Sequence, residues 1–238
     1  MMYLMFLNNN MHHITLLLCL FAIQSKLING NNSIFGIKTK DSVYISATST
    51  VSHNGVTLLE NYKWIRMIGT NVIIGLHGDI SDCDDCFSWI QSRNKIHELE
   101  FNGRSLDCKS IAYLCRNLIA SKLRTNQRMN VQILIGGYNL KINQPQLYWI
   151  DDIGSIQLVD NFAVHGKETP FILSLLDQHI NILSNHEKNL NHHPYDYMNL
   201  IKNIWIQSHK RSNQRIDISK VNVYNVDRTG CSNMLLTI

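Results

Sequence analysis

The feature of this chain that most constrains its fold is the apolar run Val131-Gln-Ile-Leu-Ile-Gly-Gly-Tyr138. Apolar residues occupy both alternating faces of the run around Leu134, which is typical of a central strand covered on both sides and not of a half-solvated edge strand. Further apolar segments follow at residues 147–154 and 162–166. Because a sheet buried on both faces needs a layer of structure above it and another below it, the run predicts a layered architecture of helices and strands.

The size and charge of the chain limit the architecture and the kind of partner. The chain has 238 residues, a mass of 27.5 kDa, 45% hydrophobic residues and only three prolines. It can bury one full core, and this predicts one compact domain. The formal net charge is +4 and, apart from the cluster His209-Lys-Arg211, the basic residues are scattered. Nucleic-acid binding normally requires a concentrated basic face, so we expect no nucleic-acid partner.

Six cysteines raise the question of a metal or redox site, because Cys83-Asp-Asp-Cys86 has the CxxC spacing that both use. No second pair follows at the spacing of a zinc site, and the pairs His12-His13 and His192-His193 have no spaced partner cluster. Flanking carboxylates raise the pKa of a thiol through their negative charge, and here they are Asp82, Asp84 and Asp85. We predict reduced thiols in the first turns of a helix, with a redox pair as the alternative, and neither a metal nor a cofactor.

An apolar run, Ile14–Ile23, lies near the amino terminus. It is shorter than the roughly 20 residues that span a bilayer, and we expect no stable membrane association. A secretory signal would explain its length, but residues 1–13 contain no Lys or Arg. A propeptide and a start at Met11 are the alternatives, and Asn31-Asn-Ser33 is a glycosylation sequon by spelling only. We treat residues 1–31 as an N-terminal extension and residues 32–238 as a single domain.

From residue 33 onward the sequence predicts a regular order of elements. Strands are expected at 34–37 and 43–47 around a polar turn, and a second pair at 63–67 and 72–76 after an irregular polar loop. Two helices follow. The first runs from about residue 79 to 99 with Asp79 or Ser81 as its N-cap, and the second ends near Arg124 with Ser105 as its N-cap.

The second half of the chain repeats this order. Strands between residues 131 and 159 precede helices at about 168–180 and 195–210, and a strand at 221–226 with the turn 227–230 closes a sheet. The order of elements is thus strands, two helices, strands, two helices and strands. This order is typical of an α+β fold in which two stacked sheets are flanked by helix layers. The sequence thus predicts a four-layer αββα sandwich.

An ordered set of short motifs resembles the proteasome beta subunits over nearly all of residues 33–230. The set comprises Gly36-Ile37, Cys115–Leu118, Gly137-Tyr138, Leu147-Tyr148, Phe162–Gly166 and Leu173–Asp177. Within that family it is most similar to the non-catalytic lineage called beta type-2, or beta-4 by ring position. The resemblance implies the αββα sandwich of the N-terminal nucleophile hydrolases. It also implies a place in the 20S core particle, in the cytoplasm and nucleus, beside other beta subunits and the alpha ring.

The resemblance also implies where catalytic residues would stand. Active members use an N-terminal threonine whose free amine helps to accept the hydroxyl proton, and Asn32 holds that position here. Thr48 replaces the supporting aspartate, and Gly166–Thr169 replaces a Gly-Ser-Gly-Ser donor turn. Lys63 falls near the family lysine, with one residue deleted before it, and Gln214 stands about where a second aspartate would be. We therefore predict no catalytic residue and no peptidase activity.

Three hypotheses for the function follow. The leading one is a structural, non-catalytic subunit that contributes to proteasome assembly and to the wall of the proteolytic chamber. The second is an active peptidase in which Ser33 becomes the nucleophile after cleavage between Asn32 and Ser33, although the aspartate and the donor turn would still be missing. The third is a secreted relative outside the complex, for which only Ile14–Ile23 argues. Four tryptophans suit subunit interfaces and a core equally, and the sequence identifies no interface residue.

Overall fold

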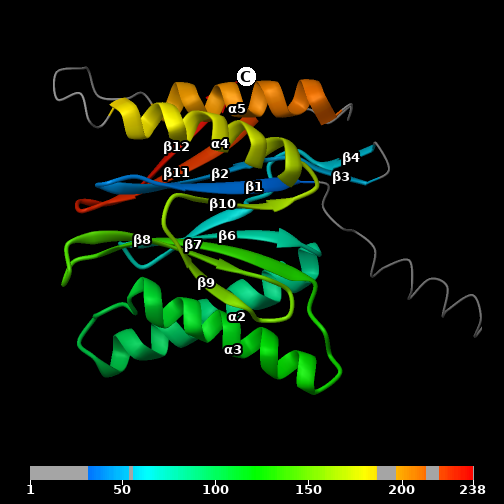
Figure 1. The fold of residues 1–238 in the computed structure, drawn as a ribbon. Coiled ribbons are helices and arrows are strands. Elements are labelled where there is room, and N and C mark those ends of the chain that lie inside the picture. Colours follow the sequence, from blue (N-terminus) through cyan, green and yellow to red (C-terminus); the bar gives the residue numbers. More distant parts are fainter. Residues whose placement is uncertain (1–31, 54–55, 187–196, 213–219, 238) are drawn as a thin grey trace, which may run out of the picture.

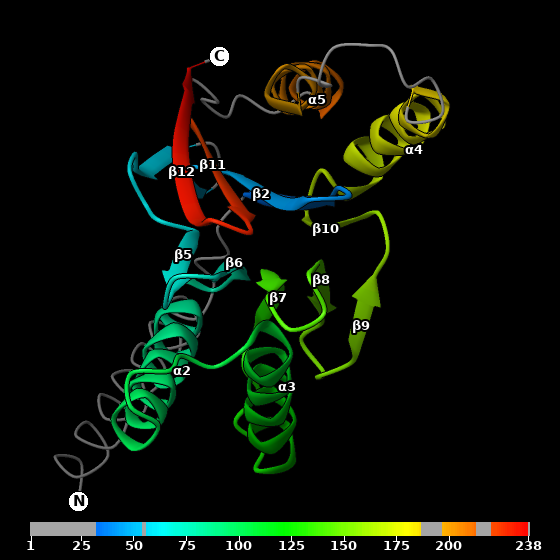
Figure 2. The same ribbon diagram turned by 90° about the vertical axis from the view of Figure 1, so that its left-hand side faces the viewer.

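Two stacked antiparallel sheets with helices on both outer faces form the molecule (Figure 1). The computed structural model describes residues 32–53, 56–186, 197–212 and 220–237. The predicted extension, residues 1–31, lies outside this range. Within the described residues the layers follow the order helices, sheet, sheet, helices, and Figure 2 shows the same order from the side. The predicted α+β sandwich of four layers is confirmed.

The first sheet has the strand order β10-β1-β2-β11-β12. Its strands are β1 (Ser33–Lys38), β2 (Ser42–Thr48), β10 (Phe162–Gly166), β11 (Lys220–Asp227) and β12 (Gly230–Thr237). Ile34 of β1 pairs with Ala47 on one side and with His165 on the other. The first strand of the domain is therefore an inner strand, with the next strand in the sequence on one side and the distant strand β10 on the other.

The outer face of this sheet is covered by α4 (Thr169–His186) and α5 (Tyr197–Ser212). A separate apolar cluster fills the space beneath these helices and includes Phe35, Leu175 and Trp205. The Trp205 ring lies 5.3 Å from the ring of Phe35, and its indole Nε1 donates a hydrogen bond of 2.7 Å to Ser46 Oγ. Burying a tryptophan with its N–H paired contributes apolar area without an unsatisfied donor.

The second sheet has the order β5-β6-β7-β8-β9. Its strands are β5 (Ile65–Ile68), β6 (Val72–Gly78), β7 (Val131–Asn139), β8 (Gln144–Ile150) and β9 (Ile156–Val159). The apolar run that begins at Val131 is its middle strand, and Leu134 is fully buried. This confirms the prediction of a central strand covered on both faces.

Two helices, α2 (Ile80–Glu100) and α3 (Cys108–Arg124), cover the outer face of the second sheet. Asp79 caps α2, and its carboxylate accepts a hydrogen bond of 3.1 Å from the Ser81 backbone N–H. The predicted cap of α3 at Ser105 is wrong. Asp107 occupies that place and accepts from the Ser110 backbone N–H at 2.9 Å, while the Ser105 hydroxyl donates to Glu98 at 2.6 Å.

Three further features differ from the prediction: a hairpin, an edge strand and the end of a helix. Residues assigned to an irregular loop form the hairpin of β3 (Val51–His53) and β4 (Val56–Leu59). The edge strand β12 was not predicted, and α4 continues six residues past the predicted end at Ile180, to His186. The start predicted for the last helix, residues 195–196, lies outside the described residues. None of the helices in the described ranges is both long and apolar enough to cross a membrane.

Glycine residues set the spacing between the two sheets. A Cβ atom on Gly136 of β7 would lie 2.8 Å from Val43 Cγ1 of β2, in the facing sheet. Such a distance is shorter than a van der Waals contact, so a side chain at this position would force the sheets apart. The glycine after the central apolar run therefore permits the close stacking of the sandwich.

Candidate functional site

The candidate site lies at the N-terminal end of β1, where Asn32 precedes the first strand residue, Ser33. Asn32 is 1% exposed and Ser33 is 3% exposed. The Asn32 Oδ1 atom lies 2.8 Å from Nδ1 of His77. Because β1 and β6 belong to different sheets, this hydrogen bond joins the two sheets at the end of β1. The Asn32 amide nitrogen has no hydrogen-bond partner in the described part of the chain.

The turn between β10 and α4 closes over the same end of β1. The backbone N–H of Glu168 donates to Ser33 Oγ at 2.9 Å, and the Thr169 hydroxyl donates to the Gly166 carbonyl at 2.6 Å. Glu168 is 5% exposed, and its carboxylate accepts from the Ser208 hydroxyl at 2.8 Å. The turn that replaces the family donor turn therefore still donates a hydrogen bond, but to Ser33 and not to Asn32.

Two uncharged histidines line the inter-sheet space beside Asn32. Burial lowers the pKa of His77 to about 4. Burial, with a smaller contribution from His77, lowers the pKa of His165 to about 4. The ring of His165 stacks on Trp149 at 5.1 Å. At neutral pH both imidazoles are therefore neutral, and a neutral imidazole can act as a base only toward a group that gives up a proton. The side chain that His77 contacts is an amide, which does not.

Thr48 lies at the same end of the sheet as Asn32, because Ile34 pairs with Ala47. Successive side chains of a strand alternate between faces, so Thr48 shares the face of Ser46, which contacts Trp205 of α5. Asn32 instead contacts His77 across the inter-sheet space. The Thr48 hydroxyl is buried and, within the described residues, unpaired. The structure thus brings the two strand ends together but directs the two side chains to opposite faces.

Lys63 is exposed and precedes β5. Its backbone carbonyl accepts a hydrogen bond of 3.0 Å from Arg66 Nε. Across the described ranges, no hydrogen bond or ion pair joins its ammonium group to Asn32, Ser33 or Thr48. Gln214 lies outside the described residues. Of the positions implied by the resemblance, the structure gathers Asn32 and the turn at Gly166–Thr169, and it leaves Lys63 at the surface.

The CxxC pair does not form a reactive centre. Cys83 and Cys86 lie in the first turns of α2, are fully buried, and are not joined by a disulfide in the structure. Burial, followed by the neighbouring Cys86 and Asp84, raises the pKa of Cys83, and burial together with Asp82 raises that of Cys86 to about 12. A thiol held neutral in this way is a poor nucleophile. The described residues contain no group of His, Cys, Asp and Glu side chains arranged to hold a metal ion.

Comparison with known proteins assigns the family. The family model described as "Proteasome subunit" matches residues 28–194, which is more than half of the chain. This chain belongs to the proteasome subunit family. The matched range includes the end of β1, both sheets except β11 and β12, and the turn at Gly166–Thr169.

Individual relatives place the chain among the beta subunits of the proteasome. A probable proteasome subunit beta type-4 from Meyerozyma guilliermondii is 27% identical over 147 residues, which cover 61% of this chain and 75% of that protein. The proteasome subunit beta type-4 of Saccharomyces cerevisiae is 26% identical over 61% of this chain and 73% of its own length. The beta type-2 subunit of Dictyostelium discoideum is 26% identical over 62% and 74%. The resemblance to proteasome beta subunits of the type-2 and type-4 kind is confirmed.

Sequence reasoning missed the most distinctive contact of this proteasome subunit, the one between Asn32 and His77. The predicted strand at 72–76 stops one residue before His77, whereas His77 is the penultimate residue of β6. One signal was available, because a histidine directly after the apolar segment Val72–Leu76 lies on a strand whose faces are both buried. Its partner comes from the other sheet, and no local pattern reports contacts between sheets.

Proposed function

We propose that this proteasome beta subunit is non-catalytic and serves as a structural member of the beta ring of the 20S core particle. In this role it contributes to assembly and to the wall of the proteolytic chamber in ubiquitin- and proteasome-dependent protein degradation. Residues 32–238 supply its beta-type domain, and residues 1–31 an extension. Its partners are beta subunits of its own and the opposite ring and subunits of the alpha ring, in the cytoplasm and nucleus.

The observation that carries the proposal is the identity and bonding of Asn32. An N-terminal nucleophile needs a hydroxyl or thiol next to a free amine, and an asparagine side chain has neither nucleophile. The Asn32 carboxamide oxygen is also engaged by His77 at 2.8 Å. The side chain at this position therefore ties the two sheets together, and the geometry favours a structural role for it.

The surroundings of Asn32 support the same proposal. A peptidase of this type needs a carboxylate and a lysine to tune the nucleophile. Thr48 carries no charge and shares the face of Ser46, and Lys63 is exposed to solvent. Three beta type-4 or type-2 names among the relatives support the ring position.

The rival hypothesis uses Ser33 as the nucleophile. Ser33 is 3% exposed, pairs with Gly166 inside the sheet, and its Oγ accepts a hydrogen bond from Glu168 N. Exposing it as a new N-terminus requires cleavage after Asn32 and loss of the contact with His77. Both requirements act against this hypothesis.

Mass spectrometry of the native high-molecular-mass fraction of the source cell tests the proposal. The fraction is first treated with an electrophile that traps N-terminal threonine, and labelled catalytic beta subunits in the same sample serve as the positive control. We expect this chain to co-purify with other proteasome subunits, without label and without an N-terminus at Ser33. Stoichiometric label on Ser33 would establish the peptidase, whereas recovery as a free glycosylated protein would establish the secreted relative.

A further inference from the structure

The β3–β4 hairpin carries apolar side chains that are exposed to solvent in the described structure. All four residues of β4 are exposed, and the exposed fractions of Val56, Leu58 and Leu59 are 62%, 48% and 48%. The hairpin forms a two-stranded sheet of its own, and no residue of β4 belongs to either apolar cluster of the described chain. Because a lone hairpin is only marginally stable, neighbouring exposed apolar residues on it indicate an interaction surface.

The base of the hairpin is anchored to the domain. Val51, the first residue of β3, is fully buried. Beyond the end of β4, the Tyr62 backbone N–H donates a hydrogen bond of 2.9 Å to the Ser49 carbonyl oxygen, which lies before the start of β3. The hairpin is therefore held at one place on the domain, and the exposed side chains of β4 offer a surface in a fixed position.

The N-terminal extension joins the domain beside the base of this hairpin. Strands β1 and β2 pair with Ile34 opposite Ala47, so the same register places Asn32 opposite Ser49. Strand β3 begins two residues after Ser49. Figure 1 shows β3 and β4 at the end of the first sheet where β1 begins. The exposed hairpin is therefore a neighbour of the point at which residues 1–31 enter the domain.

The extension is long enough for its apolar run to reach β4. Residues 24–31 separate the run Ile14–Ile23 from Asn32, and a segment of this length spans up to about 27 Å when extended. Val56, at the far end of β4, lies only about 10 Å along the strand from Leu59. Because the run and the strand belong to one chain, their contact is intramolecular, with an effective concentration on the order of millimolar.

The run and the strand also match in chemistry. Neither Ile14–Ile23 nor Val56–Leu59 contains a charged residue, and each has one threonine as its only polar residue. Packing one against the other removes apolar surface of both from water and buries no charge. Met234 and Leu235 of β12 are exposed too, but their strand belongs to a five-stranded sheet. The two-stranded hairpin therefore gains more from a cover than β12 does.

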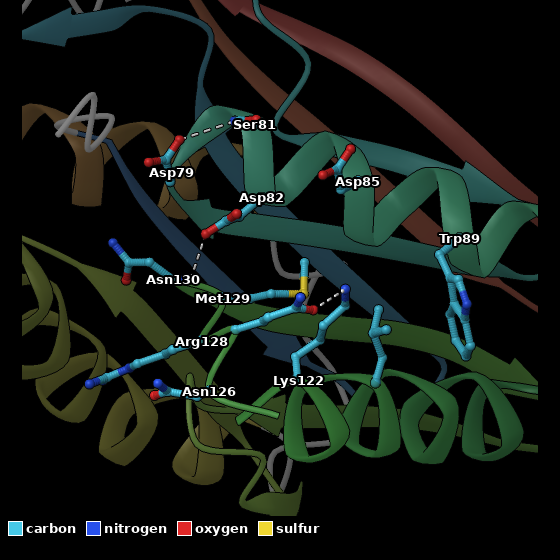
Figure 3. Close-up of a pocket in the computed structure, with 12 residues that line it drawn as sticks. Asp79, Ser81, Asp82, Asp85, Trp89, Lys122, Asn126, Arg128, Met129 and Asn130 are labelled. Carbon is cyan, nitrogen blue, oxygen red and sulfur yellow. Dashed lines mark hydrogen bonds between the residues drawn. The ribbon is translucent and has the colours of Figure 1, made fainter. Parts of the chain in front are cut away.

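The polar wall of a cavity elsewhere in the molecule is bonded within the domain. This cavity, of about 870 Å³, lies between α2, α3 and the segment that leads into β7 (Figure 3). Asp79 caps α2, and Asp82 accepts a hydrogen bond of 2.8 Å from the Asn130 backbone N–H. Lys122 in the same wall donates to Gln127 at 3.2 Å. These groups have partners in the described chain, whereas the apolar side chains of β4 do not.

We propose that the N-terminal extension packs back on its own domain, with the run Ile14–Ile23 covering the exposed side chains of β4. Residues 24–31 form the connection. The contact shields the apolar side chains of the hairpin from water and stabilises the hairpin against opening. This role of the extension goes beyond the function proposed above, and it holds whether or not the subunit is catalytic.

Amide hydrogen exchange of the full-length chain, measured by mass spectrometry, tests the proposal. The test variant combines Leu17→Asp with Leu20→Asp and so places two charges in the run. Its control combines Leu4→Asp with Leu7→Asp, the same change earlier in the extension. We expect the test variant to speed exchange of the β4 amides about tenfold, because an uncovered hairpin opens more often. The control should match the wild type, and exchange in β12 should be the same in all three chains.

Limited proteolysis with chymotrypsin gives a reciprocal test from the side of the domain. Leu58→Asp alters an exposed side chain outside both core clusters of the described chain, so it leaves the fold intact. It should speed cleavage within Ile14–Ile23 about tenfold, because the run loses its apolar contact. Leu235→Asp makes an equal change on β12 and should leave the cleavage rate unaltered.

Three results would overturn the proposal. The first is exchange in β4 that the test variant and its control alter equally, or that neither alters. The second is protection of β4 that is lost on about tenfold dilution, because the cover would then come from a second copy of the chain. The third is a run that protects β12 in place of β4. Because the isolated chain is measured, each result is independent of whether the chain enters a proteasome.

Discussion

At the residue scale, Gly166 is the position that allows β1 to begin beside the turn into α4. Its φ of +116° lies in a region that side chains avoid, and a Cβ atom there would lie 2.6 Å from both the Asn32 carbonyl oxygen and Ser33 Cα. Two independent physical reasons therefore require glycine at this position. One is its backbone conformation, and the other is the approach of the first strand.

The substitution Gly166→Ala should lower the free energy of unfolding by about 3 kcal/mol, because strain at positive φ adds to an overlap with backbone atoms. Gly103→Ala is the matched control. Its φ is +80° but no atom lies within 4 Å of the added Cβ, so only the conformational cost of about 1 kcal/mol applies. Urea denaturation of the full-length variants measures both changes. Equal losses would show that the close approach at Gly166 does not exist in solution.

His165 should make the stability of the chain depend on pH. Burial lowers its pKa to about 4 in the folded state, while the unfolded chain binds a proton near the usual value of about 6.5. The unfolded state therefore binds more protons between these values, and stability falls as pH falls from about 6.5 to 4. Between pH 7 and pH 5 the wild type should lose about 2 kcal/mol more than His165→Gln. Parallel pH profiles for the two proteins would contradict this.

The site could be predicted from the sequence only where the strand pattern reaches it. The resemblance identified Asn32 and Thr48, and the predicted strands at 34–37 and 43–47 located them in the sheet. The partner of Asn32, His77, could not be located in this way, because the contact depends on how the two sheets stack. The same limit applies to Asp79, whose place in a cavity depends on the packing of α2 against the segment after α3.

At the scale of elements, the N-cap of α3 shows how a local pattern misleads. Ser105 and Asp107 both suit a cap, and the structure selects Asp107 because the Ser105 hydroxyl is already bonded to Glu98 of α2. The competing interaction comes from another helix. A sequence window around α3 does not contain it.

Removing this cap should loosen the first turn of α3. Asp107→Ala leaves the Ser110 backbone N–H without its acceptor, which costs about 1 kcal/mol and should speed exchange of that amide about fivefold. Asp107→Asn retains an acceptor oxygen and should change the rate little. Ser105→Ala should not affect Ser110. If Ser105→Ala alone accelerates the exchange of Ser110, the cap lies at Ser105.

The elements missed by prediction share a physical cause. The β3–β4 hairpin exposes Val56, Leu58 and Leu59. Strand β4 therefore has no buried face from which a strand could be predicted. The strand β12 is an edge that pairs only with β11, and most of its residues are exposed. Periodicity predicts elements through what they bury, and the buried strands β1, β2, β6 and β7 were accordingly predicted well.

At the scale of the whole molecule, the two sheets depend on each other through Gly136 and Val43. Gly136→Ala should lower the free energy of unfolding by about 2 kcal/mol, because the added methyl group meets Val43 Cγ1 at 2.8 Å. Val43→Ala in the same chain removes that atom and should recover part of the loss. A double-mutant cycle measured by urea denaturation gives the coupling. Purely additive effects would mean that the sheets do not touch here.

The strand order of the two sheets has a consequence for the chain as it leaves the ribosome. The sheet β5–β9, with α2 and α3, is built from one continuous stretch of sequence, residues 65–159. The other sheet depends on distant segments, because at its edges Glu168 N donates to Ser33 Oγ, 135 positions earlier, and Ser49 Oγ donates to the Lys220 carbonyl, 171 positions later. One half of the sandwich can therefore form during synthesis. The hairpin of β1 and β2 can pair early, but its two outer edges have no partners until β10 and β11 have been made, and contacts of such high sequence separation form slowly.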